Sequence, residues 1–458
     1  MKQHITQRVL NVRLQVKEKV GYALGDVASN FYWRVFDVFL FIFYTDVFGL
    51  APAAVGTMML VTRIIDAFSD PVMGALADRT QTRFGKFRPY LLWGILPLAT
   101  AGVLTFTIPD FSEGGKLIWA YATYIFMMLA YTFINVPYGA MLGVITSDTQ
   151  DRTSLSSFRF IGAFSSGTLV AYMTPKLVEY FGAGNEALGW QYTMGLYGVV
   201  AALLFVGTFS MCKERVVSHQ SAPVSVRQDL TDLFHNKPWL VLFSLALIIM
   251  LTITIRGSVG TFYFKYYAER EDLIGTFSAV YLICLAIGAA ITPILTRFFD
   301  KRRLLIILMS LVTALSFVFY FVPRESIALM FVIQGAIGLC LGPKSPLVFS
   351  MYADTADYAE WKTGRRATAM VFAAAAFSQK LGGAIAAATI GGVLSYMGYV
   401  ANAVQSNTSN HGIVLLMTII PGFFALVSVW FARFYSLDAD QLAHVQSELN
   451  ERKASEAF

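Results

Sequence analysis

Charged residues are scarce in this sequence. Only 14% of its 458 residues are Asp, Glu, Lys or Arg, whereas 56% are hydrophobic. Because soluble domains typically carry about 25% charged residues, this composition excludes an ordinary soluble protein and predicts an integral membrane protein. The net charge of +6 comes from short basic clusters between apolar runs, so it does not indicate a nucleic-acid partner.

Cysteine and histidine are also rare. The three cysteines, Cys212, Cys284 and Cys340, lie in or beside apolar stretches without paired spacing, so they predict neither a disulfide framework nor a metal site. All five histidines fall in predicted tails or loops, which disfavours zinc chemistry and a histidine proton relay. Since no nucleophile–base arrangement is evident either, we expect neither an enzyme nor a cofactor.

A cleavable signal peptide is not evident. Residues 1–18 are polar, and they lack a short apolar core followed by a small-residue cleavage site. We therefore expect the first apolar segment to remain in the protein as a membrane span.

Long apolar runs are abundant. A membrane-spanning helix needs roughly 20 apolar residues, and charged or turn residues divide the chain into twelve such runs in two sets of six. The first set lies near 20–48, 53–76, 89–109, 117–146, 153–176 and 193–212. The second set lies near 238–267, 274–298, 303–323, 327–351, 369–397 and 412–434. The sequence therefore predicts twelve transmembrane helices.

The two sets indicate two pseudo-symmetric six-helix bundles. The loop "GALADRTQTRFGKFRP" after the second span resembles the Gly-x-x-x-Asp-Arg-x-x-x-Arg-x-Gly-Arg/Lys loop of major facilitator transporters. The loop "TRFFDKRR" after the eighth span resembles it more weakly. Such proteins bind substrate near mid-membrane between the bundles and alternate its access by rocking. The predicted parts are a tail at 1–18, bundles at 19–212 and 238–435, a middle loop at 213–237 and a second tail at 436–458.

The basic residues predict the orientation in the membrane. If the N-terminus is cytoplasmic, 24 of the 35 Lys and Arg residues lie on the cytoplasmic side and four on the outer side. Cytoplasmic loops carry an excess of Lys and Arg, so both termini, the middle loop and the two tails are expected in the cytoplasm.

Two carboxylates lie one helical turn apart in the second span. Asp66 and Asp70 share one helix face, and adjacent carboxylates in a low dielectric repel unless a proton or another cation lies between them. The pair predicts a coupling-ion site for Na⁺ or H⁺, to which Ser69 and Thr132 can add neutral oxygens. The alternatives are a carboxylate paired with Arg63, one turn away, or one that lies at the cytoplasmic end of the helix.

The first span carries a polar stripe. Asp26, Asn30, Arg34 and Asp37 follow one another at spacings of 4, 4 and 3, and Asp26 lies closest to the cytoplasmic end. The aromatic residues between them are Phe31, Tyr32, Trp33 and Phe36. Hydrogen-bonding groups beside aromatic rings suit a sugar, while the alternative for Arg34 and Asp37 is an internal ion pair.

Further cations lie inside spans, where a charge at the bilayer centre costs roughly 2.5–3.5 kcal/mol on insertion scales. Arg159 and Lys380 occupy the fifth and eleventh spans, which the predicted repeat relates to each other. Lys380 has no acidic residue within one helical turn, so we expect its partner, Asp66 or Asp70, on another helix. Arg256 adds another cation in the seventh span.

Several motifs match a known family in order along nearly the whole chain. They are "GYALGDVASN", "FYTDVFGL", "DAFSDPVMGALADRT", "RFGKFRPYLLWG", "NVPYGAM" and "ADTADYAEWKTGRRAT". Together they resemble the glycoside–pentoside–hexuronide:cation symporters, the group within the major facilitator superfamily that contains the melibiose permease. The resemblance implies a multi-pass protein of the bacterial cytoplasmic (inner) membrane.

The resemblance also implies roles for individual residues. The implied cation site, a metal site if the ion is Na⁺, consists of Asp66, Ser69, Asp70 and Thr132, with Lys380 linking it to the sugar site. Ser69 stands where the melibiose permease has asparagine. The implied sugar site contains Arg159 and Tyr131.

Four positions depart from the melibiose permease. Aspartates of the sugar site are replaced by Asn30 and Asn135, and tryptophans by Gly139 and Ser345. The remaining cations make the cavity more positive. These differences indicate a glycoside other than melibiose, such as a pentose-containing or β-linked oligosaccharide, with a hexuronide slightly favoured.

The sequence therefore predicts a cation-coupled glycoside symporter with a small sugar as its partner. Its predicted substrate-binding residues are Asn30, Arg34, Tyr131, Asn135, Arg159 and Arg256. The alternatives are an exporter or antiporter of the same superfamily, a membrane-embedded sugar sensor, and an enzyme acting on a lipid-linked sugar. The residue pattern does not distinguish Na⁺ from H⁺.

Overall fold

The structure is a computed structural model that describes residues 14–146, 149–215, 234–363 and 368–437, with short pieces up to residue 451. Within these ranges the chain is helical, and its one bridge of strand type joins Thr82 and Gly85. The described residues form two compact units. The first takes in residues up to 50 and 61–220, and the second takes in 51–60 and the residues after 220.

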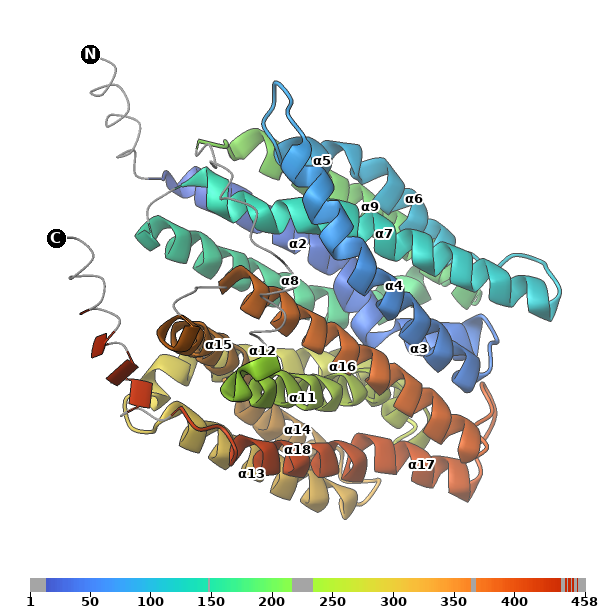
Figure 1. Ribbon diagram of the computed structural model, residues 1–458. Coiled ribbons are helices and arrows are strands. Elements are labelled where there is room, and N and C mark those ends of the chain that lie inside the picture. The colour runs from blue at the N-terminus through green and yellow to red at the C-terminus, as the bar shows by residue number, and fades with distance from the viewer. Residues whose placement is uncertain are drawn as a thin grey trace. The chain divides into compact units, whose positions relative to one another are not determined.

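The first unit contains the helices of the N-terminal half (Figure 1). They are α2 (Val16–Val38), α3 (Leu40–Ile42), η1 (Phe43–Val47), most of α4 (Pro52–Arg79), α5 (Arg88–Trp93), α6 (Ile95–Thr105), α7 (Glu113–Ile145), α8 (Thr149–Gly182) and α9 (Glu186–Met211). Helix α2 packs against α8 and α9.

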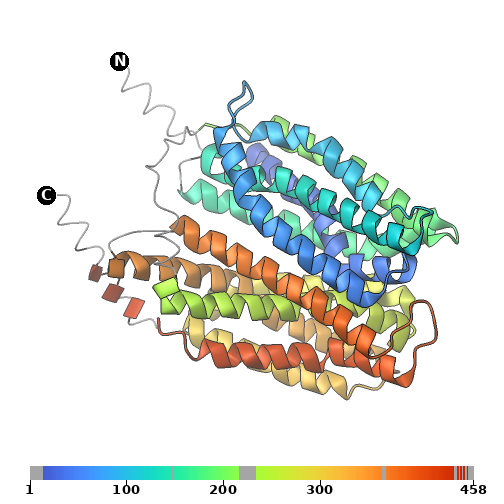
Figure 2. The same cartoon turned by 45° about the vertical axis from the view of Figure 1, so that its right-hand side comes forward.

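The second unit contains the helices of the C-terminal half, which run roughly side by side in Figure 2. They are α11 (Lys237–Phe262), η2 (Tyr263–Tyr267), η3 (Glu271–Leu273), α12 (Ile274–Leu295), α13 (Lys301–Tyr320), α14 (Ile327–Leu341), α15 (Lys344–Thr363), α16 (Thr368–Tyr396), α17 (Asn407–Met417) and α18 (Ile419–Ala432). Helix α11 packs against α16 and α18.

Each of the twelve predicted apolar stretches coincides with one helix or with a run of consecutive helices. Among the described residues, seven helical segments are long and apolar enough to cross a membrane. The all-helical class is therefore confirmed, and the helices agree with the predicted count of twelve. Both halves also end their first span in a five-residue π-helix, η1 and η2, as an internal repeat predicts.

Local sequence explains where several helices begin and break. At the start of five helices, the side-chain oxygen of the N-cap residue accepts a hydrogen bond from a backbone N–H of the first turn. These N-cap residues are Ser112, Asn185, Asn236, Asp300 and Ser406. The stretch predicted at 327–351 is interrupted at Gly342 and Pro343 and then continues to Thr363. Gly342 keeps helical backbone angles, but Pro343 has no N–H to donate to the preceding turn, which explains the break.

The loop between α4 and α5 is bound to the end of α9 by a single carboxylate. Glu214 accepts the backbone N–H groups of Lys86, Phe87 and Arg88, each at 2.8 Å. Gly85 precedes them with a φ of +113°, and a Cβ there would lie 2.6 Å from the Glu214 carboxyl carbon. A glycine is required here both for the left-handed backbone and for the close approach of Glu214.

Helix α2 approaches α7 closely at a glycine. A Cβ at Gly25 would lie 2.4 Å from the Tyr138 ring. The ring of Tyr138 stacks on Tyr22 with centroids 4.8 Å apart, and its hydroxyl donates to the Tyr22 carbonyl at 2.6 Å. These contacts fix the position of α2 along the axis of α7, and therefore which residues of the polar stripe of α2 lie beside α7.

We predict that Gly25→Ala destabilises the protein, because the new methyl group displaces Tyr138 and breaks its contacts with Tyr22. Inserting a group into a packed site typically costs about 1–3 kcal/mol. The measurement is the thermal unfolding midpoint of purified protein in detergent. Gly195→Ala is the matched control, since a Cβ there meets nothing within 4 Å; equal midpoints for the two variants would contradict the close approach.

Candidate functional site

The two carboxylates of α4 converge on one hydroxyl of α7. The Thr132 Oγ1 atom lies 2.8 Å from Asp66 Oδ1 and 3.3 Å from Asp70 Oδ1, and Asp66 is only 2% exposed. A hydroxyl has one proton and two lone pairs, so it donates to one carboxylate at a time. The cluster therefore gathers oxygen acceptors of the kind that hard cations take as ligands.

Ser69 lies between the two aspartates on α4. Its hydroxyl donates to the backbone carbonyl of Asp66 at 3.0 Å, so its proton is used within the helix. Among the described residues, no group of three or more His, Cys, Asp or Glu side chains is placed to hold a metal ion.

An arginine and two aromatic rings adjoin the carboxylate cluster. The Arg63 Nη1 atom lies 3.8 Å from Asp66 Oδ2, and its guanidinium carbon lies 4.6 Å from the centre of the Trp33 ring. Trp33 in turn stacks on Tyr131, with centroids 5.6 Å apart and an angle of 29° between the rings. Tyr131 directly precedes Thr132 on α7, so neighbouring residues of one helix contact the aromatic ring of Trp33 and the two carboxylates.

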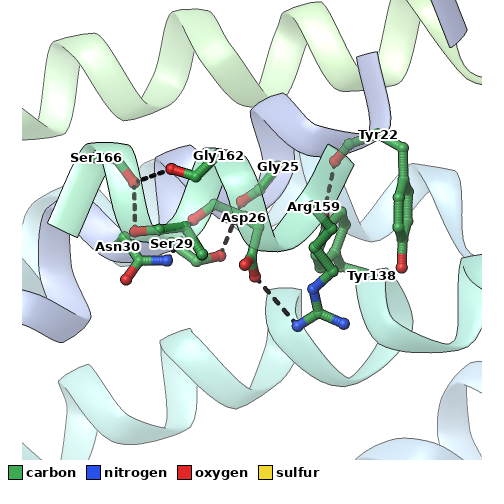
Figure 3. A network of polar contacts seen from close by, with 10 residues as sticks. Tyr22, Gly25, Asp26, Ser29, Asn30, Tyr138, Arg159, Gly162 and Ser166 are labelled. Carbon is green, nitrogen blue, oxygen red and sulfur yellow. Dashed lines mark hydrogen bonds and ion pairs between the residues drawn. The ribbon is translucent and has the colours of Figure 1, made fainter. Parts of the chain in front are cut away.

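A second charged pair joins α2 to α8 (Figure 3). Arg159 Nη2 lies 3.1 Å from Asp26 Oδ1, and the Arg159 guanidinium lies 5.3 Å from the centre of the Tyr138 ring. Asn30 Nδ2 donates to the Asp26 carbonyl at 2.9 Å, which ties it to its own helix. Three helices thus contribute to one polar network beside the stack of Tyr22 and Tyr138.

The sequence placed Asp26 nearest the cytoplasmic end and left it out of the predicted site residues. In the structure Asp26 is the carboxylate that pairs with Arg159. The position that holds an aspartate in the melibiose permease is Asn30 here, and Asp26 lies one helical turn before it on the same face. That spacing was the signal that could have identified Asp26.

Arg34 forms the internal pair that the sequence left as an alternative. Its Nη1 atom donates to Asp37 Oδ2 at 2.7 Å along α2. Asn135 lies on α7 one turn after Tyr131 and is half-buried. Both therefore lie in the first unit with Asp26 and Arg159.

Two predicted site residues belong to the second unit. Arg256 on α11 is 0% exposed, and it donates to Gln334 Oε1 at 3.1 Å and Ser316 Oγ at 2.6 Å. Among the described residues, these hydrogen-bond partners are neutral. Lys380 lies half-buried on α16.

Ion pairs and carboxylates among helices that include segments long and apolar enough to cross a membrane mark an ion or substrate pathway in membrane proteins. The chain belongs to the MFS/sugar transport protein family, whose model matches residues 21–439. The family membership predicted from the motifs is therefore confirmed, and the proteins it groups are transporters rather than enzymes.

Curated relatives cover nearly the whole chain. It is 39% identical to the uncharacterized symporter YnaJ of Bacillus subtilis, covering 96% of each protein. It is 36% identical to the putative glycoside/cation symporter YagG of Escherichia coli, covering 91% of this chain and 92% of that protein. It is 34% identical to the isoprimeverose transporter of Lactiplantibacillus pentosus, covering 94% of this chain and 91% of that protein.

A solved structure shares the fold. The chain matches a proton-dependent oligopeptide transporter with a TM-score of 0.68 at 12% identity, covering 95% of this chain and all of that one. At this identity the match shows the fold alone, which is that of the major facilitator superfamily.

We predict that Asp26 and Arg159 are energetically coupled. Asp26→Asn and Arg159→Gln each leave a partly buried partner charge uncompensated, whereas the double variant removes both. Because the Arg159 side chain is 30% exposed, the expected coupling is moderate, about 1 kcal/mol. A double-mutant cycle on thermal unfolding in detergent measures it, and strictly additive losses would contradict the pairing.

Proposed function

We propose that the protein imports a glycoside or oligosaccharide by symport with Na⁺ or H⁺ through alternating access. The observation that carries the proposal is the convergence of Asp66 and Asp70 on the Thr132 hydroxyl. This oxygen cluster lies beside the stacked rings of Trp33 and Tyr131. A site for a cation and a surface for a sugar thus adjoin each other within the first unit.

The carboxylate cluster is the proposed coupling-ion site. A cation bound by Asp66, Asp70 and Thr132 offsets the repulsion between the carboxylates, with Ser69 as a further neutral ligand. Lys380 supplies the link to the sugar site that the family resemblance implies. Each ligand then shifts the conformational balance by its differential affinity, and each tightens the binding of the other reciprocally.

The sugar site is proposed to use the polar and aromatic groups of the first unit. These are Asn30, Arg34, Tyr131, Asn135 and Arg159, with Arg256 in the second unit. Aromatic rings offer apolar faces, and the amide and guanidinium groups offer hydrogen-bond donors to hydroxyls.

A pentose-containing or uronic-acid glycoside is the proposed substrate class. The cations of the site and the loss of two acidic groups at Asn30 and Asn135 support it. One relative is named an isoprimeverose transporter, and another a putative glycoside/cation symporter.

We also propose that the protein resides in the bacterial inner membrane with both termini in the cytoplasm. The excess of Lys and Arg on the predicted cytoplasmic side supports this orientation. The predicted bundles at 19–212 and 238–435 then lie in the membrane, and the segment at 213–237 is cytoplasmic.

The test is uptake of labelled glycosides into proteoliposomes under an imposed Na⁺ or H⁺ gradient. The panel contains pentosides, hexuronides and melibiose. We expect accumulation of a pentoside or hexuronide above its equilibrium level under one of the two gradients, and no accumulation without a gradient. The absence of accumulation under both gradients, in verified folded protein, would contradict symport. Sugar uptake driven by an ion gradient directed out of the liposomes would contradict it as well.

We predict that Asp70→Asn abolishes uphill accumulation while leaving membrane insertion and folding intact. The substitution removes one of the two carboxylates that hold the coupling cation, so sugar movement loses its driving force. Asp272→Asn is the control, because Asp272 is an exposed carboxylate of the short helix η3 and is paired with Arg270. Full accumulation by the Asp70→Asn variant would remove this carboxylate from the coupling mechanism.

A further inference from the structure

Arg63 lies between the carboxylate cluster and the aromatic pair without being tightly bound to either. Its Nη1 atom is 3.8 Å from Asp66 Oδ2, which is longer than a charge-assisted hydrogen bond of about 2.7–2.9 Å. This Nη1 atom is buried and has no hydrogen-bond partner among the described residues. The guanidinium carbon also lies 4.6 Å from the centre of the Trp33 ring.

The neighbouring arginines of the first unit differ from Arg63 in this respect. Arg34 donates to Asp37 at 2.7 Å, and Arg159 donates to Asp26 at 3.1 Å. Arg159 also lies 5.3 Å from the centre of the Tyr138 ring, but each of these two arginines has a carboxylate within hydrogen-bond distance. Arg63 instead divides its charge between a carboxylate, through a long contact, and an aromatic face, through a cation–π contact.

We propose that Arg63 is a positioning residue. It responds to the charge state of Asp66 and Asp70 and changes its contact with Trp33, which forms the proposed sugar-binding surface together with Tyr131. The proposal rests on the proposed function. When positive charge arrives at Asp66 and Asp70, the attraction of Arg63 to Asp66 weakens, because the carboxylate is then compensated from its other side. The attraction to the Trp33 ring is unchanged, so the guanidinium shifts toward Trp33.

The shift reaches the substrate site through one aromatic contact. Trp33 stacks on Tyr131, a proposed sugar-binding residue next to Thr132. A guanidinium held over Trp33 restrains the stack of Trp33 and Tyr131 and so orders the aromatic surface proposed to receive the sugar. The cation therefore raises the affinity for sugar, and by reciprocity the sugar raises the affinity for the cation.

The first measurement follows the fluorescence of Trp33. Its contribution is the emission spectrum of the parent protein minus that of the Trp33→Phe variant in the same background. We expect Asp66→Asn, which neutralises the carboxylate whatever the coupling ion is, to shift this contribution. In an Arg63→Gln background the same substitution is expected to produce no shift.

The second measurement is the dependence of the sugar KM on the coupling cation in proteoliposomes. Coupling of this kind typically amounts to about 5–150-fold. We expect the ratio of the sugar KM values without and with the coupling cation to fall to near one in Arg63→Gln and in Trp33→Leu. Arg63→Lys is expected to recover part of this ratio, because lysine restores the positive charge but not the planar guanidinium. Trp33→Leu tests the contact without altering Arg63.

Arg83→Gln is the matched control. Its guanidinium lies 4.6 Å from the Phe84 ring, so it loses a contact of the same length in the exposed loop after α4. Neither the Trp33 fluorescence nor the cation dependence of KM is expected to change. A change as large as that of Arg63→Gln would overturn the assignment to Arg63.

The results distinguish this inference from the proposed function. If symport is observed but the Trp33 contribution does not respond to Asp66→Asn, or Arg63→Gln keeps the cation dependence of KM, the inference is wrong and symport stands. If neither gradient drives uptake, but Asp66→Asn shifts the Trp33 fluorescence and Arg63→Gln abolishes that shift, the role of Arg63 is supported and the proposed function is wrong.

Discussion

The first unit is organised around the electrostatic requirement of two carboxylates within one apolar helix. Ionised groups are costly to bury unless hydrogen bonds or opposite charges reach them, and two like charges add mutual repulsion. The Thr132 hydroxyl lies within hydrogen-bond distance of both Asp66 and Asp70, and the Arg63 guanidinium lies 3.8 Å from Asp66. The oxygen-rich arrangement that makes the pair costly to bury also makes it suitable for a small cation, so one constraint serves both folding and the proposed function.

Helix α2 is the element on which the neighbouring helices converge. Its close approach at Gly25 sets its position against α7, and it packs along α8 and α9. Asp26 on this helix receives Arg159 from α8, and Trp33 receives Arg63 from α4 and Tyr131 from α7. One helix thus carries a charged contact and an aromatic contact about two turns apart, which places two proposed recognition surfaces on a single rigid element.

The sequence predicts contacts within a helix better than contacts between helices. The spacing of Asp66 and Asp70 predicts a shared face, and the spacing of Arg34 and Asp37 offers an internal pair as one of two alternatives. The pairing of Asp26 with Arg159 joins residues 133 positions apart, so no local periodicity encodes it. The family fold was predictable from the motifs, but the neutral partners of a buried arginine on α11 depend on which faces of α13 and α14 pack against it.

The first unit contains two kinds of arginine environment, and they suit two different tasks. A closed pair such as Asp26 with Arg159 holds one geometry, because separating the partners leaves charge uncompensated in a low dielectric; this suits discrimination among sugars. A responsive element needs two arrangements of similar free energy, since a ligand shifts a balance only by its differential affinity. A guanidinium shared between a carboxylate at 3.8 Å and a ring at 4.6 Å meets that condition. Selectivity and coupling can therefore reside in different arginines of one helical unit, and a change in one need not alter the other.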